Sequence, residues 1–415
     1  MLKVKGPAIL LMCFFAMQLH AQPNPLQVPA PPFVDLQANR IITRGSERPW
    51  SHFQEKLDRL LFDGSGQINI VHVGGSHIQA DMWSMHMRHR SQHMAPGVRG
   101  GRGFIFPYNM AKSNNPYWYH PDFTGSWTSV KNTRKDEQGV LGLAGYSVTT
   151  HDTLATLKVS FRGDVYGGYT FNRIKVLHRQ DSSYAVDAFS YDSTLTITKL
   201  PHPEKGYTEF IYSGHTDTLR LQFHQEGPEQ VRFTLYGIIM ENDDPGIRYH
   251  ATGVNGASTT SWLRCERFAE ELALVKPDLV VFSIGINDAH DSDFSAARYK
   301  RNYEELIARV RAVAPDCAIL LTTNTDSFVG RRTPNKNAEA VRRVMLELSA
   351  EQGAAVWDTW GVMGGEGSIR MWEDAGLAKK DRVHFNRAGY TLLGDLLFSA
   401  MMESYGEHIR KVSRP

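Results

Sequence analysis

The stretch Val71–Asp81, VHVGGSHIQAD, joins the end of an apolar strand to the start of a helix through a turn of small residues. The strand begins upstream in INI, and apolar side chains recur at helical spacing from Ile78 to Met87, predicting a helix that ends near Met94. A strand-to-helix turn of this kind brings backbone N–H groups to the edge of a sheet. Ser76, inside the turn, is therefore either a nucleophile held up to solvent or an N-cap of the helix.

Alternation of helices and strands returns in the second half of the chain. After Gly253, the segment TTSWLRCERFAEELALV (259–275) is predicted as one helix, and apolar strands follow in the ranges 277–288, 317–325 and 354–361. Apolar strands that alternate with helices are typical of a parallel sheet covered on both faces. Because the first strand–helix unit has the same character, we expect both parts of the chain to contribute to one sheet.

Residues 116–245 have a different character. Short β-rich runs, from ATLKVSFRG (155–163) to VRFTLYGIIM (231–240), are separated by polar turns or by turns that contain glycine or proline. Runs at this spacing indicate an antiparallel sandwich or jelly roll. The sequence therefore predicts a β-sandwich domain at 116–245, inserted into an α/β domain formed by residues 49–115 and 246–415. An extended lead-in, rich in proline and glutamine, occupies residues 22–48.

The N-terminus has the features of a secretory signal peptide at residues 1–21. Lys3 and Lys5 precede the apolar run AILLMCFFAM, and Ala21 provides a small residue at a cleavage site. The run is too short to span a bilayer as a stable anchor, and Cys13 lacks the preceding small residues of a lipoprotein cleavage site. We therefore expect a soluble protein without membrane spans, exported to the periplasm or the extracellular space.

Charge and cysteine content narrow the function classes. The chain has 46 basic and 44 acidic residues and no basic block, so we expect no nucleic-acid partner. Cys265 and Cys317 would remain after cleavage, either as one disulfide or as two buried thiols. His86, His89 and His93 lie at helical spacing, but a metal site needs ligands from a second element, and a solvated helix face is the alternative interpretation.

Several strand ends carry the residue types that acyl transfer requires. In an open parallel sheet, sites form at the carboxyl ends of the strands. Ser76 follows the first strand, Gly256 precedes a helix in GVNGAST, Asn287 ends the strand of 277–288, and Asp381 and His384 lie in DRVHFN. A serine needs a base to take its proton, and a carboxylate beside histidine fixes the imidazole tautomer. Backbone N–H groups and an amide side chain can stabilise an oxyanion.

In this order and at these positions, the chain resembles the SGNH/GDSL hydrolase superfamily. The matching motifs are GGSH with Ser76, VNGAS with Gly256, GIND with Asn287, and DRVH with Asp381 and His384. The resemblance implies a flavodoxin-like three-layer α/β fold and no cofactor or metal. It also implies that Ser76 is the nucleophile and first oxyanion donor, that Gly256 and Asn287 are the other donors, and that His384 is the base with Asp381 as its partner.

Two further features refine the resemblance. The family often has an aspartate before the serine, where this chain has Gly75. The long insert is similar to that of exported SGNH esterases with a carbohydrate-binding-like sandwich, a branch that includes peptidoglycan O-acetylesterases. The implied partner is an acetylated polysaccharide. The alternatives are an O-acetyltransferase that uses the same acyl-serine, or a glycan-binding protein with weak activity.

The aromatic residues in YNMAKSNNPYWYH (108–120) could form a sugar platform or pack between the domains.

Overall fold

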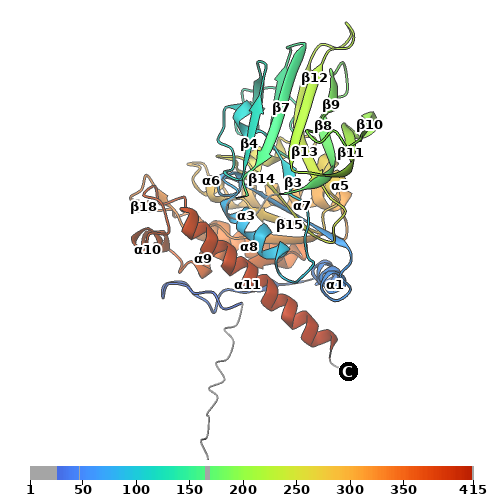
Figure 1. The fold of residues 1–415 in the computed structure, drawn as a ribbon. Helices are drawn as coiled ribbons and strands as arrows, with labels where there is room; N and C mark the ends of the chain where they lie inside the picture. Colours follow the sequence, from blue (N-terminus) through green and yellow to red (C-terminus); the bar gives the residue numbers. More distant parts are fainter. Residues whose placement is uncertain (1–25, 46, 164–168, 414–415) are drawn as a thin grey trace, which may run out of the picture.

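The computed structural model describes residues 26–45, 47–163 and 169–413. It has an α/β part and a part built of antiparallel strands, which lies above the α/β part in Figure 1. The predicted signal peptide lies outside the described residues. Within the described ranges, no helix is both long enough and apolar enough to cross a membrane.

A six-stranded sheet forms the centre of the α/β part, in the order β1-β19-β16-β15-β2-β14. The strands β19, β16, β15, β2 and β14 are parallel to one another, while the edge strand β1 is antiparallel to β19. Their bounds are β1 Ile41–Thr43, β2 Gln67–Gly74, β14 Gly246–Gly253, β15 Leu279–Ser283, β16 Ala318–Thr322 and β19 Ala355–Trp357. The sheet thus joins β2 to strands that follow the antiparallel part in the chain.

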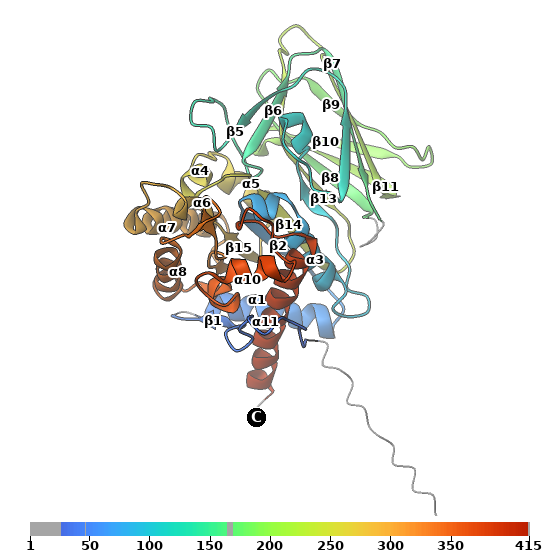
Figure 2. The same cartoon turned by 90° about the vertical axis from the view of Figure 1, so that its left-hand side faces the viewer.

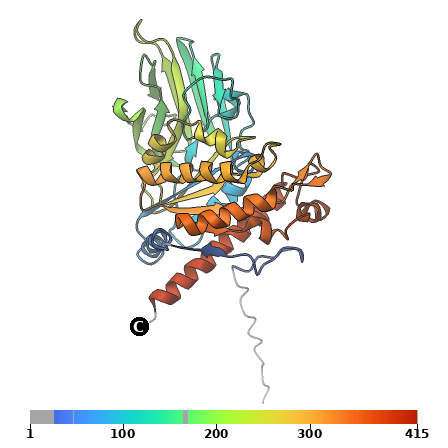
Figure 3. The same cartoon turned by 180° about the vertical axis from the view of Figure 1, so that it is seen from behind.

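Helices cover both faces of this sheet, giving three layers. Side chains alternate along the strands, so Leu279 and Val281 belong to one hydrophobic cluster while Val280 and Phe282 belong to the other. The first cluster contains residues of α1 (Arg48–Phe62), α2 (Ser76–Gln79), α3 (Met82–Gln92), α9 (Thr359–Val362), α10 (Ser368–Asp374) and α11 (Arg387–Val412). The second contains residues of α4 (Thr259–Leu263), α5 (Phe268–Val275), α6 (Ile286–Ala289), α7 (Ala296–Val313) and α8 (Ala338–Gln352), and Figure 3 shows α7 and α8, in orange, on this face.

The antiparallel strands form two facing sheets, visible at the top of Figure 2. One contains β3 (Gly103–Ile105), β5 (Thr128–Lys131), β6 (Tyr146–Thr150), β8 (Phe171–His178), β10 (Ile197–His202), β11 (Tyr207–Thr216) and β13 (Phe233–Glu241). The other contains β4 (Tyr119–Phe123), β7 (Leu154–Phe161), β9 (Ala185–Ala188) and β12 (Thr218–His224). Smaller elements are η1 (Tyr108–Ala111), η2 (Pro203–Lys205) and the hairpin β17–β18 (Phe328–Val329, Thr333–Pro334). The inner faces of both sheets share one hydrophobic cluster with the adjoining face of the α/β part.

The helix after the serine turn is broken, so the prediction of one continuous helix to about Met94 is wrong. Asp81 separates α2 from α3 and has a left-handed backbone with φ 51°. Its buried carboxylate accepts a hydrogen bond from Ser84 Oγ at 2.6 Å and pairs with the buried guanidinium groups of Arg88 and Arg102. The buried guanidinium groups of Arg88 and Arg102 need a buried anion. The Asp81 carboxylate supplies this anion from the position where the helix is broken.

The predicted helix at 259–275 is also wrong as a single element, because contacts to the antiparallel part interrupt it. The backbone N–H of Arg267 donates to the carbonyl of Leu141 at 3.0 Å instead of continuing a helix from α4. The Arg264 guanidinium donates to backbone carbonyls at Asn132 and Arg134, at 2.8 and 2.7 Å. Cys265, in the same turn, is a buried free thiol.

The remaining alternatives from the sequence are resolved by packing. Cys317, like Cys265, is a free buried thiol, so the two cysteines do not form a disulfide. On the histidine face of α3, His86 packs against α11, where its Nε2 contacts Asp395 Oδ1 at 2.9 Å, while His93 at the end of the helix is exposed. His86 is therefore a packed residue, not part of a solvated face. In the chain that the structure describes, no group of three or more histidine, cysteine or acidic residues is arranged to hold a metal ion.

Candidate active site

The site forms where β2, β14 and β15 end at the same edge of the parallel sheet. A side chain at either Gly74 or Gly253 would collide with the start of α2, since a Cβ would lie 2.3 Å from Ile78 Cγ1 or 2.1 Å from the backbone N of Gln79. The two glycines therefore let α2 begin directly on top of the strand ends. Ser76 is the first residue of α2, Gly75 occupies the N-cap position, and no side-chain cap is formed.

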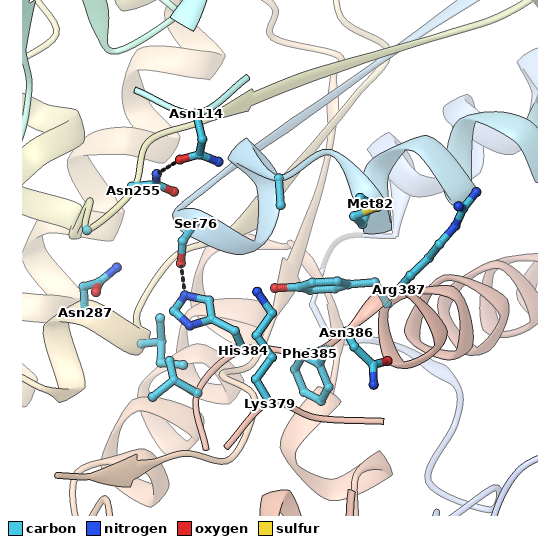
Figure 4. Close-up of a pocket in the computed structure, with 15 residues that line it drawn as sticks. Ser76, Met82, Asn114, Asn255, Asn287, Lys379, His384, Phe385, Asn386 and Arg387 are labelled. Atoms are coloured by element: carbon cyan, nitrogen blue, oxygen red, sulfur yellow. Dashed lines mark hydrogen bonds between the residues drawn. The ribbon is translucent and has the colours of Figure 1, made fainter. Parts of the chain in front are cut away.

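Ser76 points at a histidine instead of capping its helix. Its Oγ lies 2.8 Å from His384 Nε2 (Figure 4). On the other side of the imidazole, His384 Nδ1 lies 2.9 Å from Asp381 Oδ2. Because an ionised carboxylate only accepts hydrogen bonds, His384 carries its proton on Nδ1 and turns the bare Nε2 towards Ser76. This is the tautomer that can accept the serine proton.

Asp381 is held in its ionised form by the tight turn that it shares with His384. Its Oδ1 accepts hydrogen bonds from the backbone N–H groups of Val383 at 3.0 Å and His384 at 2.9 Å. Burial raises the pKa of Asp381, but these backbone hydrogen bonds and the contact with the His384 ring outweigh burial, so the pKa lies below its ordinary value. The carboxylate therefore stays charged and fixes the orientation of the imidazole.

The two predicted oxyanion donors lie in the loop after β14 and in α6. Gly256, with φ 83°, and Asn287 both line the pocket that contains Ser76 and His384. The Asn287 amide donates to the carbonyl of Ala257 at 2.9 Å, which leaves its second N–H for a ligand. A Cβ at position 75 would lie 3.2 Å from Asn287 Nδ2, so Gly75 gives this amide the room that a larger side chain would restrict.

Neighbouring carboxyl and amide groups hold these donors in place. Asp288 accepts hydrogen bonds from Thr259 N–H at 3.0 Å and from Thr259 Oγ1 at 2.6 Å, and so ties α6 to α4. Burial raises the pKa of Asp288 to about 6. Gln79 Oε1 accepts the backbone N–H of Asn255 at 2.7 Å, which fixes the loop in front of Gly256. The loop and the short helix are thus positioned independently of any ligand.

The pocket has a volume of about 670 Å³ and includes residues that the sequence did not single out. Asn114 and Asn255 form one wall and bond to each other at 2.7 Å (Figure 4). Lys379 and Arg387 supply positive charge, and the lining contains no aspartate or glutamate. The two cations flank the DRVHF segment and could have been found from that position. The asparagine pair could not, because its members come from segments about 140 residues apart.

The histidines on either side of the turn are structural. His77 Nδ1 lies 2.7 Å from Tyr390 Oη, and burial, together with nearby His384, lowers the pKa of His77 to about 3. His72 lies between Ser283 Oγ at 2.6 Å and Tyr249 Oη at 2.8 Å, and burial lowers its pKa to about 3 as well. Both rings are therefore neutral and serve to fix the strand and the turn.

Three of the four aromatic side chains in the segment 108–120 are buried, and Tyr117 is exposed. Trp118 is buried and donates from Nε1 to the backbone carbonyl of Asp81 at 2.8 Å. Tyr108 and Tyr119 are also buried, and their hydroxyls bond to backbone carbonyls. Of the two interpretations of residues 108–120, packing between the domains therefore holds for these buried side chains, and a sugar platform does not.

The family model of GDSL-like lipases and acylhydrolases matches residues 238–392. This match over part of the chain confirms the resemblance to the GDSL/SGNH hydrolase family, and the parallel α/β core with an additional antiparallel β module confirms the fold class expected from the sequence.

Among solved structures, a peptidoglycan O-acetylesterase is similar over 88% of this chain and 99% of its own, with a TM-score of 0.70 and 21% sequence identity. An acetylxylan esterase from Geobacillus stearothermophilus matches 38% of this chain and 73% of its own, at 22% identity and a TM-score of 0.31. A GDSL-like lipase from Parabacteroides merdae covers the same shares at 16% identity and a TM-score of 0.30. No curated protein matches the sequence.

Replacement of Asn287 by alanine is expected to lower kcat by about 10²- to 10³-fold, because one donor to the developing negative charge is lost. KM should change much less, since the charge develops only in the transition state. Initial-rate kinetics on a soluble acetyl ester measure both constants. Asn172→Ala, which removes an amide that donates to Asp243 on the antiparallel part, is the matched control. If the kcat of Asn287→Ala stayed within about threefold of the wild-type value, Asn287 would not be an oxyanion donor.

Proposed function

We propose that the protein is an exported serine esterase that removes O-acetyl groups from a polysaccharide, with peptidoglycan as the favoured substrate. The observation that carries the proposal is the hydrogen-bonded series Ser76–His384–Asp381 at the wall of a pocket that also contains Gly256 and Asn287. A hydroxyl, a base in the correct tautomer, an ionised orienting carboxylate and facing donors are the requirements of acyl transfer.

The reaction proceeds in two halves. Ser76 Oγ attacks the acetyl carbonyl while His384 Nε2 takes its proton, and the N–H groups of Ser76 and Gly256 and the Asn287 amide stabilise the oxyanion. His384 then returns the proton to the sugar oxygen as the ester bond breaks, leaving acetyl-Ser76. In the second half, His384 activates water, which attacks the acetyl group, and acetate leaves as Ser76 regains its proton.

Two observations favour peptidoglycan over a neutral glycan. The fold is similar to a peptidoglycan O-acetylesterase along nearly its whole length, including the antiparallel module. In addition, Lys379 and Arg387 line the pocket, and Arg387 lies with its guanidinium carbon 5.1 Å from the Trp118 ring centroid. The peptide stems of peptidoglycan carry carboxylates, whereas a plain xylan backbone does not, so the charge of the pocket complements the former.

The substrate assignment is tested by release of free acetate from O-acetylated peptidoglycan and from acetylxylan. We expect the higher kcat/KM on peptidoglycan. Combined Lys379→Gln and Arg387→Gln should lower kcat/KM on peptidoglycan more than on a small neutral acetyl ester, and high salt should reduce the difference. Glutamine at Lys336, a lysine outside the pocket, is the control. A kcat/KM on acetylxylan equal to that on peptidoglycan would contradict the proposal. Transfer of the acetyl group to a glycan acceptor without release of free acetate would contradict it as well.

Export is proposed from the sequence of residues 1–21, with its two lysines, apolar run and Ala21. N-terminal sequencing of the protein recovered from the periplasm or the culture medium should give Gln22 or a neighbouring residue. A retained N-terminus, or a lipid attached to Cys13, would contradict cleavage by this route.

A further inference from the structure

The four-stranded sheet of the antiparallel part carries a second concave surface, which shares no residue with the pocket of Ser76. This groove has a volume of about 380 Å³, within the size range of small-ligand sites. We define the outer groove by Phe123, Lys158, Phe189, Tyr191 and Arg220. The strands β4, β7, β9 and β12 that form the sheet lie in the upper part of Figure 1.

The outer groove concentrates exposed aromatic rings. Among the residues that the structure describes, five aromatic side chains are exposed, and Phe123, Phe189 and Tyr191 are three of them. Tyr191 is 65% exposed although its ring lies against two cations. Large exposed apolar groups gathered in one hollow mark a binding surface rather than random surface composition.

The cations beneath Tyr191 are placed at a cost to the sheet. Leu157 and Leu221 point into the core, so the adjacent Lys158 and Arg220 point outward, and these two are directly opposite each other on β7 and β12. Like charges at such paired positions destabilise a sheet. Among the described residues neither side chain forms an ion pair, and the Tyr191 ring centroid lies 4.2 Å from Arg220 Cζ and 5.7 Å from Lys158 Nζ.

Polar groups complete the lining. Thr156 and Gln222, cross-strand partners in the next outward-facing row, provide a hydroxyl and an amide. Asp122 is opposite Lys158 on the neighbouring strand, and its carboxylate lies 3.0 Å from His120 Nε2. Rings that match the C–H faces of sugars, cations for carboxylates, and donors and acceptors for hydroxyls are the three features that a charged glycan requires.

We propose that the outer groove is a second binding site that holds a carboxylate-bearing polysaccharide, with a sugar ring stacked on Tyr191 and carboxylates paired with Lys158 and Arg220. This site goes beyond the esterase function, because it needs neither Ser76 nor an acetyl group. It would keep the enzyme on a polymer between successive cleavage events.

The test measures equilibrium binding of the whole mature protein to polygalacturonate, to purified peptidoglycan and to neutral xylan. Polygalacturonate and peptidoglycan should bind more tightly than xylan, and binding should weaken as salt rises. Tyr191→Ala should weaken binding to the acidic polymers by about fivefold to tenfold. Lys158→Gln with Arg220→Gln should remove the preference over xylan. Phe62→Ala, which removes an exposed ring from α1, should bind as wild type does.

Thermal unfolding of each variant shows that it is folded. The proposal would be overturned if Tyr191→Ala bound the acidic polymers as tightly as wild type does. It would also be overturned if wild type bound xylan as tightly as polygalacturonate. Hydrolysis of a small acetyl ester by the wild type is measured in parallel. Its absence would contradict the esterase function while the binding data still decide the outer groove, so the two failures can be told apart.

Discussion

Ser76→Ala is expected to lower turnover of an acetyl ester by about 10⁴- to 10⁶-fold, the range found when a serine nucleophile is removed. The Ser76 hydroxyl is held 2.8 Å from His384 Nε2, and an alanine offers no oxygen to attack or to pass on a proton. Steady-state kinetics on a soluble ester give the ratio. Ser65→Ala, which alters an exposed serine just before β2, is the control and should retain full activity.

A serine-directed phosphonate provides an independent measurement of the same role. Mass spectrometry should locate the label on Ser76, and labelling should slow at acidic pH, where a protonated imidazole cannot accept the hydroxyl proton. Full activity of Ser76→Ala, or a label on another residue, would refute the assignment of the nucleophile. The attacking group would then be another residue of the chain.

Asp381→Asn is the second substitution with a large expected effect, a loss of about 10³- to 10⁴-fold in kcat. The asparagine Oδ1 can still accept the backbone N–H groups of Val383 and His384, so the turn should persist. Its amide would face His384 Nδ1 and donate to it, which moves the ring proton to Nε2 and leaves Ser76 without a base.

The test compares wild type and Asp381→Asn in two quantities, kcat across the neutral pH range and the melting temperature. Because the pKa of Asp381 lies below its ordinary value, the wild-type carboxylate stays ionised throughout, and the comparison reports only the change of side chain. Asp374→Asn, at the exposed end of α10, is the control. An Asp381→Asn enzyme with nearly full kcat and an unchanged melting temperature would show that the carboxylate does not set the tautomer.

The parts of the fold that follow from local patterns were predictable. The apolar run before Gly74 and the alternation after Gly253 led to the parallel sheet, and the short β-rich runs in 116–245 led to the antiparallel module. Strand ends of a parallel sheet meet at one edge, so residues such as Ser76 and Asn287 could be expected to lie together, and the structure places both in one pocket.

What could not be predicted depends on contacts between distant segments. The break at Asp81 exists because Arg102 reaches it from outside the helix, and the break after α4 exists because Arg267 donates to Leu141. Helical periodicity records neither contact, since both partners lie elsewhere in the sequence. Asn114 entered the pocket in the same way, through its bond to Asn255. The outer groove depends on Tyr191 folding back over two strands, which no spacing rule reveals.

The position of β2 between β15 and β14 also sets the order in which the molecule can fold. Both neighbours of this strand are made after the antiparallel module, so β2 cannot be paired on either side until residues beyond 246 have been added. Such pairings of high sequence separation form slowly, and unpaired strands aggregate. The antiparallel module can close its own hairpins meanwhile, so we expect it to form first and to bring the ends of β2 and β14 together.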